Sequence, residues 1–283
     1  MSKALPILED DGLCVEEAGI WAERKYLLVW YYAEIFATAM KNKWSSRVYI
    51  DLFSSCGRSK YKGMKTIVPA SPLLTLDIPD RFDKYVFCES NKGKIDALRE
   101  RVEALSIDVD VRYINDDVNR SIDELLKVIP QHKKGFSVLS FCFIDPYNIS
   151  NFSFKVIEYL SKKHQMDFLV LIPSYMDANR SYSARIRDDN ITMEDFTGQH
   201  NWREDWDEAM KIGQSFATFA VDLFGNSMSK LGYIYTGLDD VVEIRWDERN
   251  LPLYHLAFFS KSKLAIKLWR QAIKYSTNQM DLF

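Results

Sequence analysis

The sequence predicts an α/β fold with a mostly parallel sheet, and two patterns predict it. Short runs of β-branched and aromatic residues alternate with amphipathic segments of helical length, as in repeated βαβ units. One of these runs is almost entirely apolar, which is typical of a strand buried on both faces of a parallel sheet. The predicted strands are Val48–Phe53, Tyr85–Cys88, Val109–Ile114, Ser137–Ile144 and Asp167–Ile172, of which Ser137–Ile144 is the apolar run.

The segments between these strands have the spacing of helices. Predicted helices cover Ser71–Leu76, Lys92–Leu105, Arg120–Ile129 and Phe152–Lys163. Before the first strand, apolar residues such as Trp21, Leu28 and Tyr32 recur at spacings of three and four and predict a helix over Val15–Lys43. The charged residues Glu23, Arg24 and Lys25 are expected on its other side.

The alternation stops after Ser174, and this change predicts the domain organisation. We expect residues 1–174 and 232–275 to form the core, and residues 175–231 to form an inserted, largely helical lid. Strands at Tyr233–Thr236, Val241–Trp246 and Leu253–Ser260 would give the sheet an antiparallel strand near the carboxyl terminus, followed by a helix over Leu264–Tyr275. Residues 276–283 are expected to be a flexible tail.

Composition excludes several classes of protein. The chain has 283 residues, of which 47% are hydrophobic and 27% charged, with a net charge of −3, so there is no global basic signature for nucleic acid. The four cysteines lack CxxC spacing, which favours reduced structural thiols in a cytoplasmic protein over a metal site. The longest apolar run, Tyr26–Met40, contains Glu34 and is too short to span a bilayer, so no membrane segment is expected.

Acidic residues end four consecutive predicted strands: Asp51, Glu89, Asp116 and Asp145. Open α/β sheets bind ligands at the carboxyl ends of their strands, so these side chains are expected to gather at one edge. Carboxylates there suit a ligand rich in hydroxyl, amine or cationic groups. The alternative is that they are loop residues that favour turns and cap helices.

The loop after the first strand reads Ser54-Ser55-Cys56-Gly57, and it limits the choice of cofactor. It lacks the Gly-x-Gly-x-x-Gly fingerprint of dinucleotide sites, and the chain has no P-loop motif. S-adenosylmethionine has no phosphate, so small loop residues could admit its methionine part, while the acids after strands two and three accept its ribose hydroxyls and adenine amine. The predicted cofactor residues are Asp51, Ser54, Gly57, Glu89, Asp116 and Asp117.

Asp145-Pro146-Tyr147 follows the fourth strand and is the sharpest chemical motif. Methyltransferases that act on nucleobase amines carry an Asp/Asn-Pro-Pro-aromatic segment here, in which the acid accepts hydrogen bonds from the amine and the ring stacks on a flipped base. This chain has one proline, with Asn148 at the usual aromatic position, so Tyr147 would stack one position early. The alternative is a proline-containing turn after a buried strand.

Taken together, several segments resemble the three-Cys-motif partner (TcmP) family. The similar residues are Trp21, Lys25, Tyr32, Tyr49–Phe53, Gly57-Arg58, Ser71-Pro72, Glu89–Asn91, Asn115–Asn119, Phe143–Pro146, Phe196, Gly198, Trp202, Leu253-Tyr254 and Phe258–Lys261. The resemblance implies a Rossmann-like class I S-adenosylmethionine-dependent methyltransferase fold, a radical-S-adenosylmethionine-like partner protein with three cysteines, and a role in bacterial defence or mobile-element loci. The chain departs at Ser54-Ser55-Cys56, where the family tends to Ala-Gly-Pro.

The carboxyl terminus carries a second resemblance. Gln279-Met280-Asp281-Leu282-Phe283 is similar to the peptide that docks on the bacterial sliding clamp, because two apolar anchors end a polar tail. The same residues could instead fold back onto the domain.

These observations lead to one main functional hypothesis and one rival. The first is a methyltransferase acting on nucleic acid or a nucleobase-type amine, with catalytic residues Asp145, Pro146 and Tyr147. Its predicted lid would contact phosphates through Arg180, Arg185 and Arg187. The rival is a methyltransferase-like domain that has lost turnover and serves as a sensor or binding subunit of a defence complex.

Overall fold

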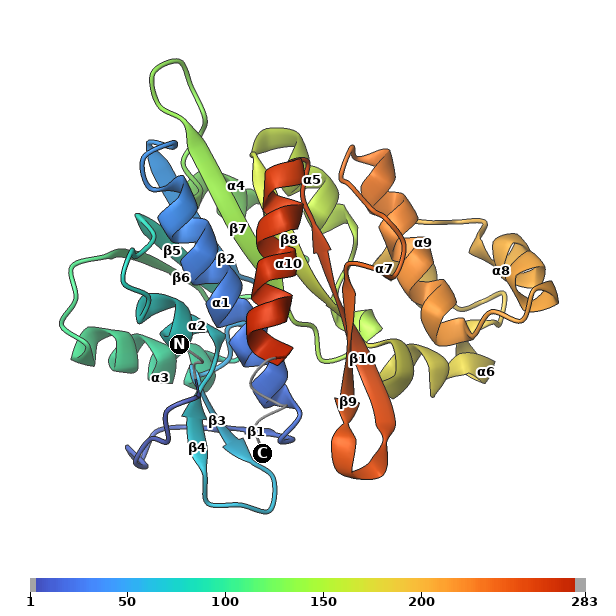
Figure 1. Cartoon of the computed structure of the whole chain (residues 1–283), viewed down its shortest axis with the longest axis horizontal. Helices are drawn as coiled ribbons and strands as arrows, with labels where there is room; N and C mark the ends of the chain where they lie inside the picture. Colours follow the sequence, from blue (N-terminus) through green and yellow to red (C-terminus); the bar gives the residue numbers. More distant parts are fainter. Residues whose placement is uncertain (1–3, 278–283) are drawn as a thin grey trace.

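The computed structural model describes residues 4–277, and its centre is a seven-stranded sheet (Figure 1). The strands lie in the order β6-β5-β2-β7-β8-β10-β9. In that order, their bounds are Asp110–Ile114, Lys84–Cys88, Ser46–Asp51, Val138–Ile144, Met166–Ile172, Leu251–Phe259 and Val241–Trp246. The five predicted strands therefore all form, with boundaries that differ by one or two residues.

The pairing is mostly parallel, as predicted. β2 pairs in parallel with β5 on one side and with β7 on the other, and β6 and β8 extend the parallel sheet outward. β10 runs antiparallel to both of its neighbours, β8 and β9. The predicted strand at Tyr233–Thr236 does not form, because this segment makes only isolated bridges at Ile234 and Thr236.

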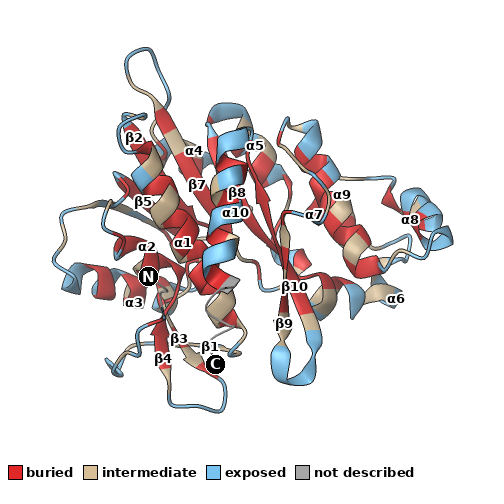
Figure 2. Cartoon of the chain, viewed as in Figure 1, coloured by how far each residue is buried: buried red, intermediate tan, exposed pale blue. Residues whose placement is uncertain are grey.

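Helices cover both faces of the sheet, and strand alternation assigns side chains to the two faces. Tyr49 points to the cluster under α1, α2, α3 and α10, whereas Val48 and Ile50 point to the cluster under α4, α5 and α9. The inner strands β5, β2, β7, β8 and β10 are largely buried, the edge strands β6 and β9 are partly exposed, and the helices expose their outer faces (Figure 2). The helices of the first face are α1 Ala22–Met40, α2 Ser71–Leu76, α3 Lys92–Ala104 and α10 Lys263–Thr277; those of the second are α4 Ile122–Val128, α5 Lys155–Lys163 and α9 Phe216–Lys230.

The segment 175–231 behaves differently along its length. η2 Ser174–Asn179, α6 Tyr182–Arg185, α7 Thr192–Thr197 and α8 Trp202–Lys211 precede α9. Phe224 of α9 stacks edge-on against Phe154 after β7 and lies 5.7 Å, between ring centroids, from Phe259 of β10. α9 therefore belongs to the layer on the sheet, although the sequence analysis places it in the lid. The domain boundaries themselves remain predictions.

Three local features differ from the sequence-based expectation. The helix predicted from Val15 begins at Ala22, because β1 Glu16–Ala18 is a strand. β1 pairs in parallel with β3 Arg58–Tyr61, which pairs antiparallel with β4 Ile67–Pro69 and so forms a small second sheet. At the other end, α10 continues to Thr277, two residues into the segment predicted as a tail. The clamp-like residues Gln279–Phe283 lie outside the described residues.

Candidate functional site

The predicted acidic residues gather at the carboxyl edge of the sheet. Asp51 is the last residue of β2, Glu89 follows β5, Asp116 lies just after β6, and Asp145 follows β7. Because these strands are neighbours in the order β6-β5-β2-β7 and all run in one direction, their carboxyl ends lie side by side. The structure thus brings the four strand-end acids together, while their roles remain predictions.

Asp51 is a structural centre of this edge. It is completely buried and accepts hydrogen bonds from the Ser71 hydroxyl at 2.7 Å, the Tyr49 hydroxyl at 3.1 Å and the Phe53 backbone N–H at 3.2 Å. Burial raises the pKa of Asp51 to about 7, opposed by the bond from Ser71 and reinforced by the negative charge of Asp145. A ligand cannot reach this carboxylate without displacing its protein partners. Asp51 therefore has a structural role, in which it binds Tyr49, Phe53 and Ser71 together beneath the edge.

Asp145 is held by a lysine that the sequence analysis places on the wrong side of its helix. Lys25 of α1 donates to Asp145 Oδ2 at 2.6 Å, and its side chain is only 11% exposed. Burial by itself lowers the pKa of Lys25, but the Asp145 carboxylate reverses this effect and the net pKa is raised. The signal was present in the sequence, because Lys25 lies four residues after Trp21 and three before Leu28, on the apolar stripe.

Two tyrosines complete the surroundings of this ion pair, and neither was predicted as a site residue. Tyr254 of β10 is buried, and its hydroxyl has no hydrogen-bond partner among the described residues. Burial raises its pKa, with opposing contributions from the charges of Lys25 and Asp145. Tyr26 is buried beside Lys25 and shares a 2.7 Å hydrogen bond with Ser59. Nothing in the local sequence distinguishes Tyr254 from other strand tyrosines.

The other two residues of the Asp-Pro-Tyr motif differ in burial. Pro146 is buried, whereas Tyr147 is 92% exposed. Asn148 caps the short 3-10 helix Ile149–Asn151 through a bond from the Ser150 N–H to its side chain. The ring of Tyr147 is thus free to take a stacking partner, but the structure by itself also fits the alternative of a proline-containing turn.

The loop after β2 is tied to the neighbouring strand. The Ser54 N–H and hydroxyl both donate to the Cys88 carbonyl, at 3.0 and 3.2 Å, so this side chain faces the protein. Gly57 has φ of +81°, a backbone conformation that glycine adopts readily. The Ser54 N–H and hydroxyl and the Ser55 N–H are therefore all paired within the protein.

Glu89 and Asp116 both keep some acceptor capacity, although three groups already donate to Glu89, one of them the Ser90 hydroxyl at 3.4 Å. Glu89 accepts the Ser55 N–H at 3.1 Å and the Asn91 N–H at 2.8 Å, one on each carboxylate oxygen. Asp116 accepts Arg120 at 2.7 Å on Oδ1 and is half-buried. A carboxylate has about four acceptor positions, so both groups retain capacity for hydroxyl or amine donors.

Asp117, also predicted as a cofactor residue, has a local role in the structure. Its carboxylate accepts the Asn119 N–H at 2.9 Å, and its carbonyl accepts the Ser121 hydroxyl at 2.8 Å. These bonds close the turn into α4. Ser121 is at the N-cap position of α4 but makes no side-chain capping bond.

The amino-terminal segment packs beside the loop, which the sequence did not indicate. Glu16 of β1 accepts the Ser55 hydroxyl at 3.1 Å and forms an ion pair with Lys94. The buried Arg101 of α3 joins Asp11 to the Cys56 carbonyl, which it reaches at 2.6 Å. These contacts hold the loop in addition to the bond from Ser55 to Glu89.

The arginines predicted as phosphate contacts are partly neutralised. Arg185 pairs with Asp177 at 3.0 Å, and Arg187 pairs with Asp189 at 2.7 Å. Arg180 is exposed and has no ion pair within residues 4–277. The contact of these arginines with phosphate therefore stays a prediction. Arg180 is the best candidate of the three, because it has no such ion pair.

The described residues give no support for a metal site or a membrane span. No group of three His, Cys, Asp or Glu side chains in residues 4–277 is arranged to hold a metal ion. None of the helices in that range is long and apolar enough to cross a bilayer.

The sheet order and the antiparallel β10 are those of the class I S-adenosylmethionine-dependent methyltransferase fold. No family model and no curated protein matches the chain. Similar solved structures include a Legionella pneumophila protein of the family DUF519, 10% identical, with a TM-score of 0.47 over 88% of this chain and 91% of that one. An O-methyltransferase from Bacillus cereus in complex with SAH is 10% identical, with a TM-score of 0.43 over 81% and 80% of the two chains.

A third similar structure is a Klebsiella pneumoniae protein described as an O-methyltransferase. It is 10% identical to this chain, with a TM-score of 0.42 over 87% of this chain and 91% of that one. These likenesses concern the fold alone. The resemblance to the TcmP family stays a prediction.

Proposed function

We propose that this chain is an S-adenosylmethionine-dependent methyltransferase that acts on a nucleobase-type amine in nucleic acid. The observation that carries the proposal is the arrangement at the carboxyl edge, where the ion-paired Asp145 shares one sheet edge with Glu89 and Asp116. In an open α/β sheet this edge is where ligands bind.

The acids on β5 and β6 fit the cofactor. Glu89 has about one of its four acceptor positions left for a ribose hydroxyl, because Ser55, Ser90 and Asn91 already donate to it, and Asp116 has Oδ2 left for the adenine amine. Neither side chain has its acceptor capacity filled by protein donors, in contrast to the buried Asp51. The cofactor would supply an electrophilic methyl group when bound.

Asp145 and its neighbours would orient the acceptor amine. Lys25 donates to Oδ2 at 2.6 Å, so the remaining oxygen can accept an N–H of the amine. The unpartnered hydroxyl of Tyr254 offers a further hydrogen bond near the same pair. Tyr147, at 92% exposure, provides an aromatic face that a base could cover. The rate would then depend mainly on positioning.

A second candidate is a binding subunit without turnover. It is favoured by the same ion pair, because Lys25 already occupies one oxygen of Asp145, and by the inward-facing Ser54 hydroxyl. In that case the chain would bind its ligand for sensing within a defence complex. The three-Cys-motif partner and the sliding clamp contacted through Gln279–Phe283 are the proposed partners in either case.

Calorimetry with S-adenosylmethionine separates these functions. Glu89→Ala removes the proposed ribose acceptor, so we expect roughly ten-fold or greater weakening, since hydrogen bonds to charged groups contribute about 1.5–3 kcal/mol. Glu89→Gln keeps one acceptor oxygen and should lose less. Glu100→Ala, an exposed acid on α3, is the matched control and should bind as wild type does.

The outcomes are distinct. Absence of binding by the wild-type chain would reject the methyltransferase proposal. Binding followed by transfer of labelled methyl groups to DNA or RNA would support it. Binding without transfer to DNA, RNA or protein would favour the sensing subunit.

A further inference from the structure

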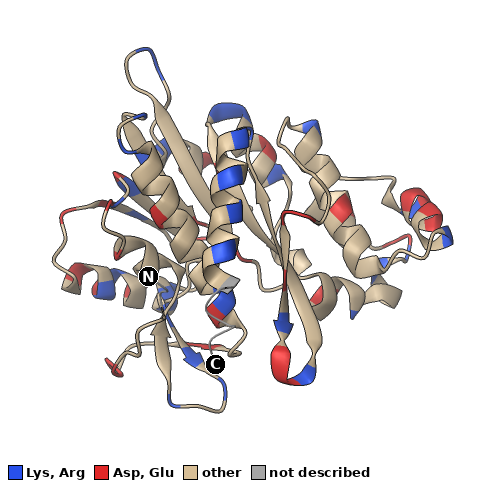
Figure 3. Cartoon of the chain, in the orientation of Figure 1, with Lys and Arg blue, Asp and Glu red and all other residues tan. Residues whose placement is uncertain are grey.

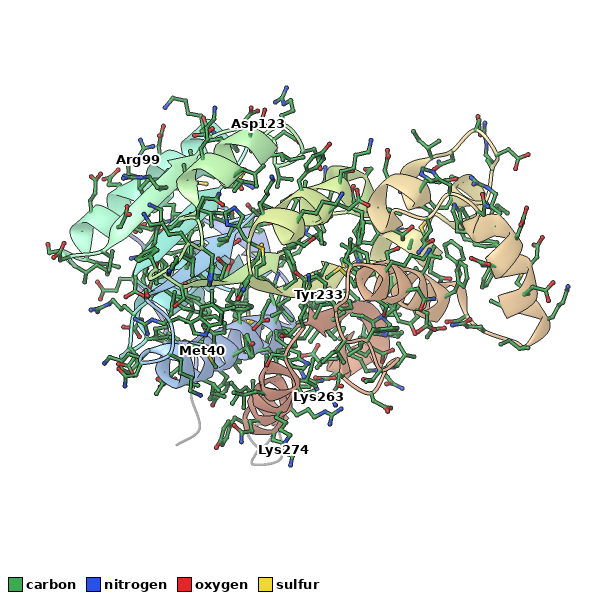
Figure 4. The ribbon with its side chains drawn as sticks, turned by 90° about the horizontal axis from the view of Figure 1, so that it is seen from above. Met40, Arg99, Asp123, Tyr233, Lys263 and Lys274 are labelled. Carbon is green, nitrogen blue, oxygen red and sulfur yellow. The ribbon has the colours of Figure 1, made fainter. Side chains whose placement is uncertain are left out.

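A cavity lies at the opposite edge of the sheet from the candidate site. It has a volume of about 680 Å³ and lies between α1 and α10, over the amino-terminal ends of β7 and β8. Figure 4 looks onto this edge and labels three residues there: Met40 of α1, Tyr233 after α9, and Lys263 of α10. Its volume falls within the range of ordinary ligand pockets, about 300–1,000 Å³.

The inner wall of this cavity carries polar groups without partners. The Tyr233 hydroxyl and His164 Nε2 are buried and make no hydrogen bond within residues 4–277. Leaving a buried polar atom unpaired costs about 1–3 kcal/mol, and native proteins rarely do so. Both residues line the cavity, so a molecule bound there could satisfy them.

A buried carboxylate lies on the same wall. Asp167, the second residue of β8, accepts the Tyr32 hydroxyl at 3.0 Å and is 5% exposed. The cavity wall therefore combines an acceptor at Asp167 with a hydroxyl donor at Tyr233. A planar ring that presents both N–H and acceptor atoms along its edge would match this pair.

The outer rim is basic. Lys43, Lys162, Lys163 and Lys261 line the cavity, are exposed, and form no ion pair with any described residue. Figure 3 shows further basic residues at this end of the molecule, at the tip of the loop before β7. In a chain with a net charge of −3, this is a local excess of positive charge that favours an anion.

Apolar side chains form the space between the rim and the inner wall. Phe36 and Met40 of α1 face Ala265 and Leu268 of α10 across the cavity, and the indole of Trp44 lies beside them. Such walls accept the faces of a flat, weakly polar ring. The cavity thus has three zones: an anion-attracting rim, apolar sides and a polar inner wall.

We propose that this cavity binds a nucleotide, either free or at the end of a nucleic acid. The phosphate would lie at the lysine rim, the base between the apolar walls, and the base edge against Tyr233, His164 and Asp167. This site is separate from the carboxyl edge and does not depend on the function proposed for that edge.

Titration calorimetry of the full chain tests the proposal, with AMP, GMP, CMP and UMP as probes. Inorganic phosphate and a short 5′-phosphorylated single-stranded DNA are titrated in parallel. Tyr233→Phe removes only the unpartnered hydroxyl, and we expect it to weaken nucleotide binding by roughly two- to ten-fold. Lys163→Gln should weaken binding by roughly two- to five-fold, because its charge is exposed and screened.

The controls separate this site from other modes of binding. Lys267→Gln removes an exposed lysine of α10 that does not line the cavity, and it should leave the dissociation constant unchanged. Excess S-adenosylmethionine should not displace the nucleotide, because the proposed cofactor residues lie at the other edge. Tighter binding of the oligonucleotide than of any mononucleotide identifies a nucleic-acid end as the ligand; the reverse identifies a free nucleotide.

Three results would overturn the proposal. The first is no binding of any nucleotide or of the oligonucleotide at millimolar concentration. The second is equal affinity for inorganic phosphate and nucleotides, which would show that the base is not recognised. The third is the same dissociation constant for wild type, Tyr233→Phe and Lys163→Gln.

Discussion

Replacing Asp51 with a residue that cannot ionise should raise the stability of the protein, relative to wild type, more at pH 8 than at pH 5. The carboxyl group is completely buried, and its pKa is raised from 3.8 to about 7. The folded protein therefore binds a proton at Asp51 that the unfolded chain releases between these two values. The resulting stability is fully present below pH 3.8 and is lost as pH rises through about 7.

The magnitude follows from this shift. At 1.36 kcal/mol per pKa unit, the whole effect is about 4 kcal/mol, of which about 3 kcal/mol falls between pH 5 and pH 8. In Asp51→Asn the side chain cannot ionise, while its oxygen and amide can still pair with Phe53, Ser71 and Tyr49. The difference in unfolding free energy, variant minus wild type, should rise by about 3 kcal/mol over that range.

Urea denaturation at pH 5, 6, 7 and 8 measures this difference, with the midpoints followed by both circular dichroism and tryptophan fluorescence. Asp77→Asn serves as the control, because Asp77 is exposed and should follow the wild-type profile. A constant difference between Asp51→Asn and wild type across all four pH values would refute the reasoning. It would show that Asp51 is charged in the folded protein without the energetic penalty of burial.

Two further predictions concern neighbouring parts of the same edge. Lys25→Gln leaves Asp145 without its cation and should destabilise the fold by about 2–3 kcal/mol. This is less than the loss expected for a fully buried pair, because Asp145 is 18% exposed. Adding Asp145→Asn should recover part of the loss in a double-mutant cycle, and simple additivity of the two effects would contradict the pairing. Gly57→Ala should cost about 2 kcal/mol, measured as a shift in the urea midpoint, because φ is +81° and a Cβ would lie 2.7 Å from Leu98 Cδ1. Gly63→Ala is its control, since φ is +78° with no atom within 4 Å, and equal losses would show that the Leu98 contact is unimportant.

The candidate site was predictable in its outline but not in its partners. The acids Glu89, Asp116 and Asp145 could be placed at one edge, because each follows a strand and parallel strands present the same end. Which of them would be available to a ligand could not be predicted. Asp117 has the same side chain as Asp116 and is the next residue in the sequence, yet its carboxylate closes a turn.

The partners of these acids come from distant parts of the chain. Lys25 is 120 residues from Asp145, and Tyr254 comes from the antiparallel strand β10. A helical pattern indicates which residues share a face, and on that basis Lys25 belonged with the apolar stripe. Only packing against the sheet shows that a lysine on that stripe finds an acid to neutralise it. The same holds for the amino-edge cavity, whose walls come from α1, α5, β8 and α10.

The sequence by itself determined the alternation of strands and helices, the parallel centre of the sheet and the acids at its carboxyl edge. These features depend on local periodicity and on short apolar runs, both of which can be recognised in the sequence. The tertiary structure alone decided that β1 would join a second sheet, that α9 would cover the main sheet, and that Lys25 would neutralise Asp145. Those outcomes depend on contacts between residues far apart in sequence, and no local pattern specifies such contacts.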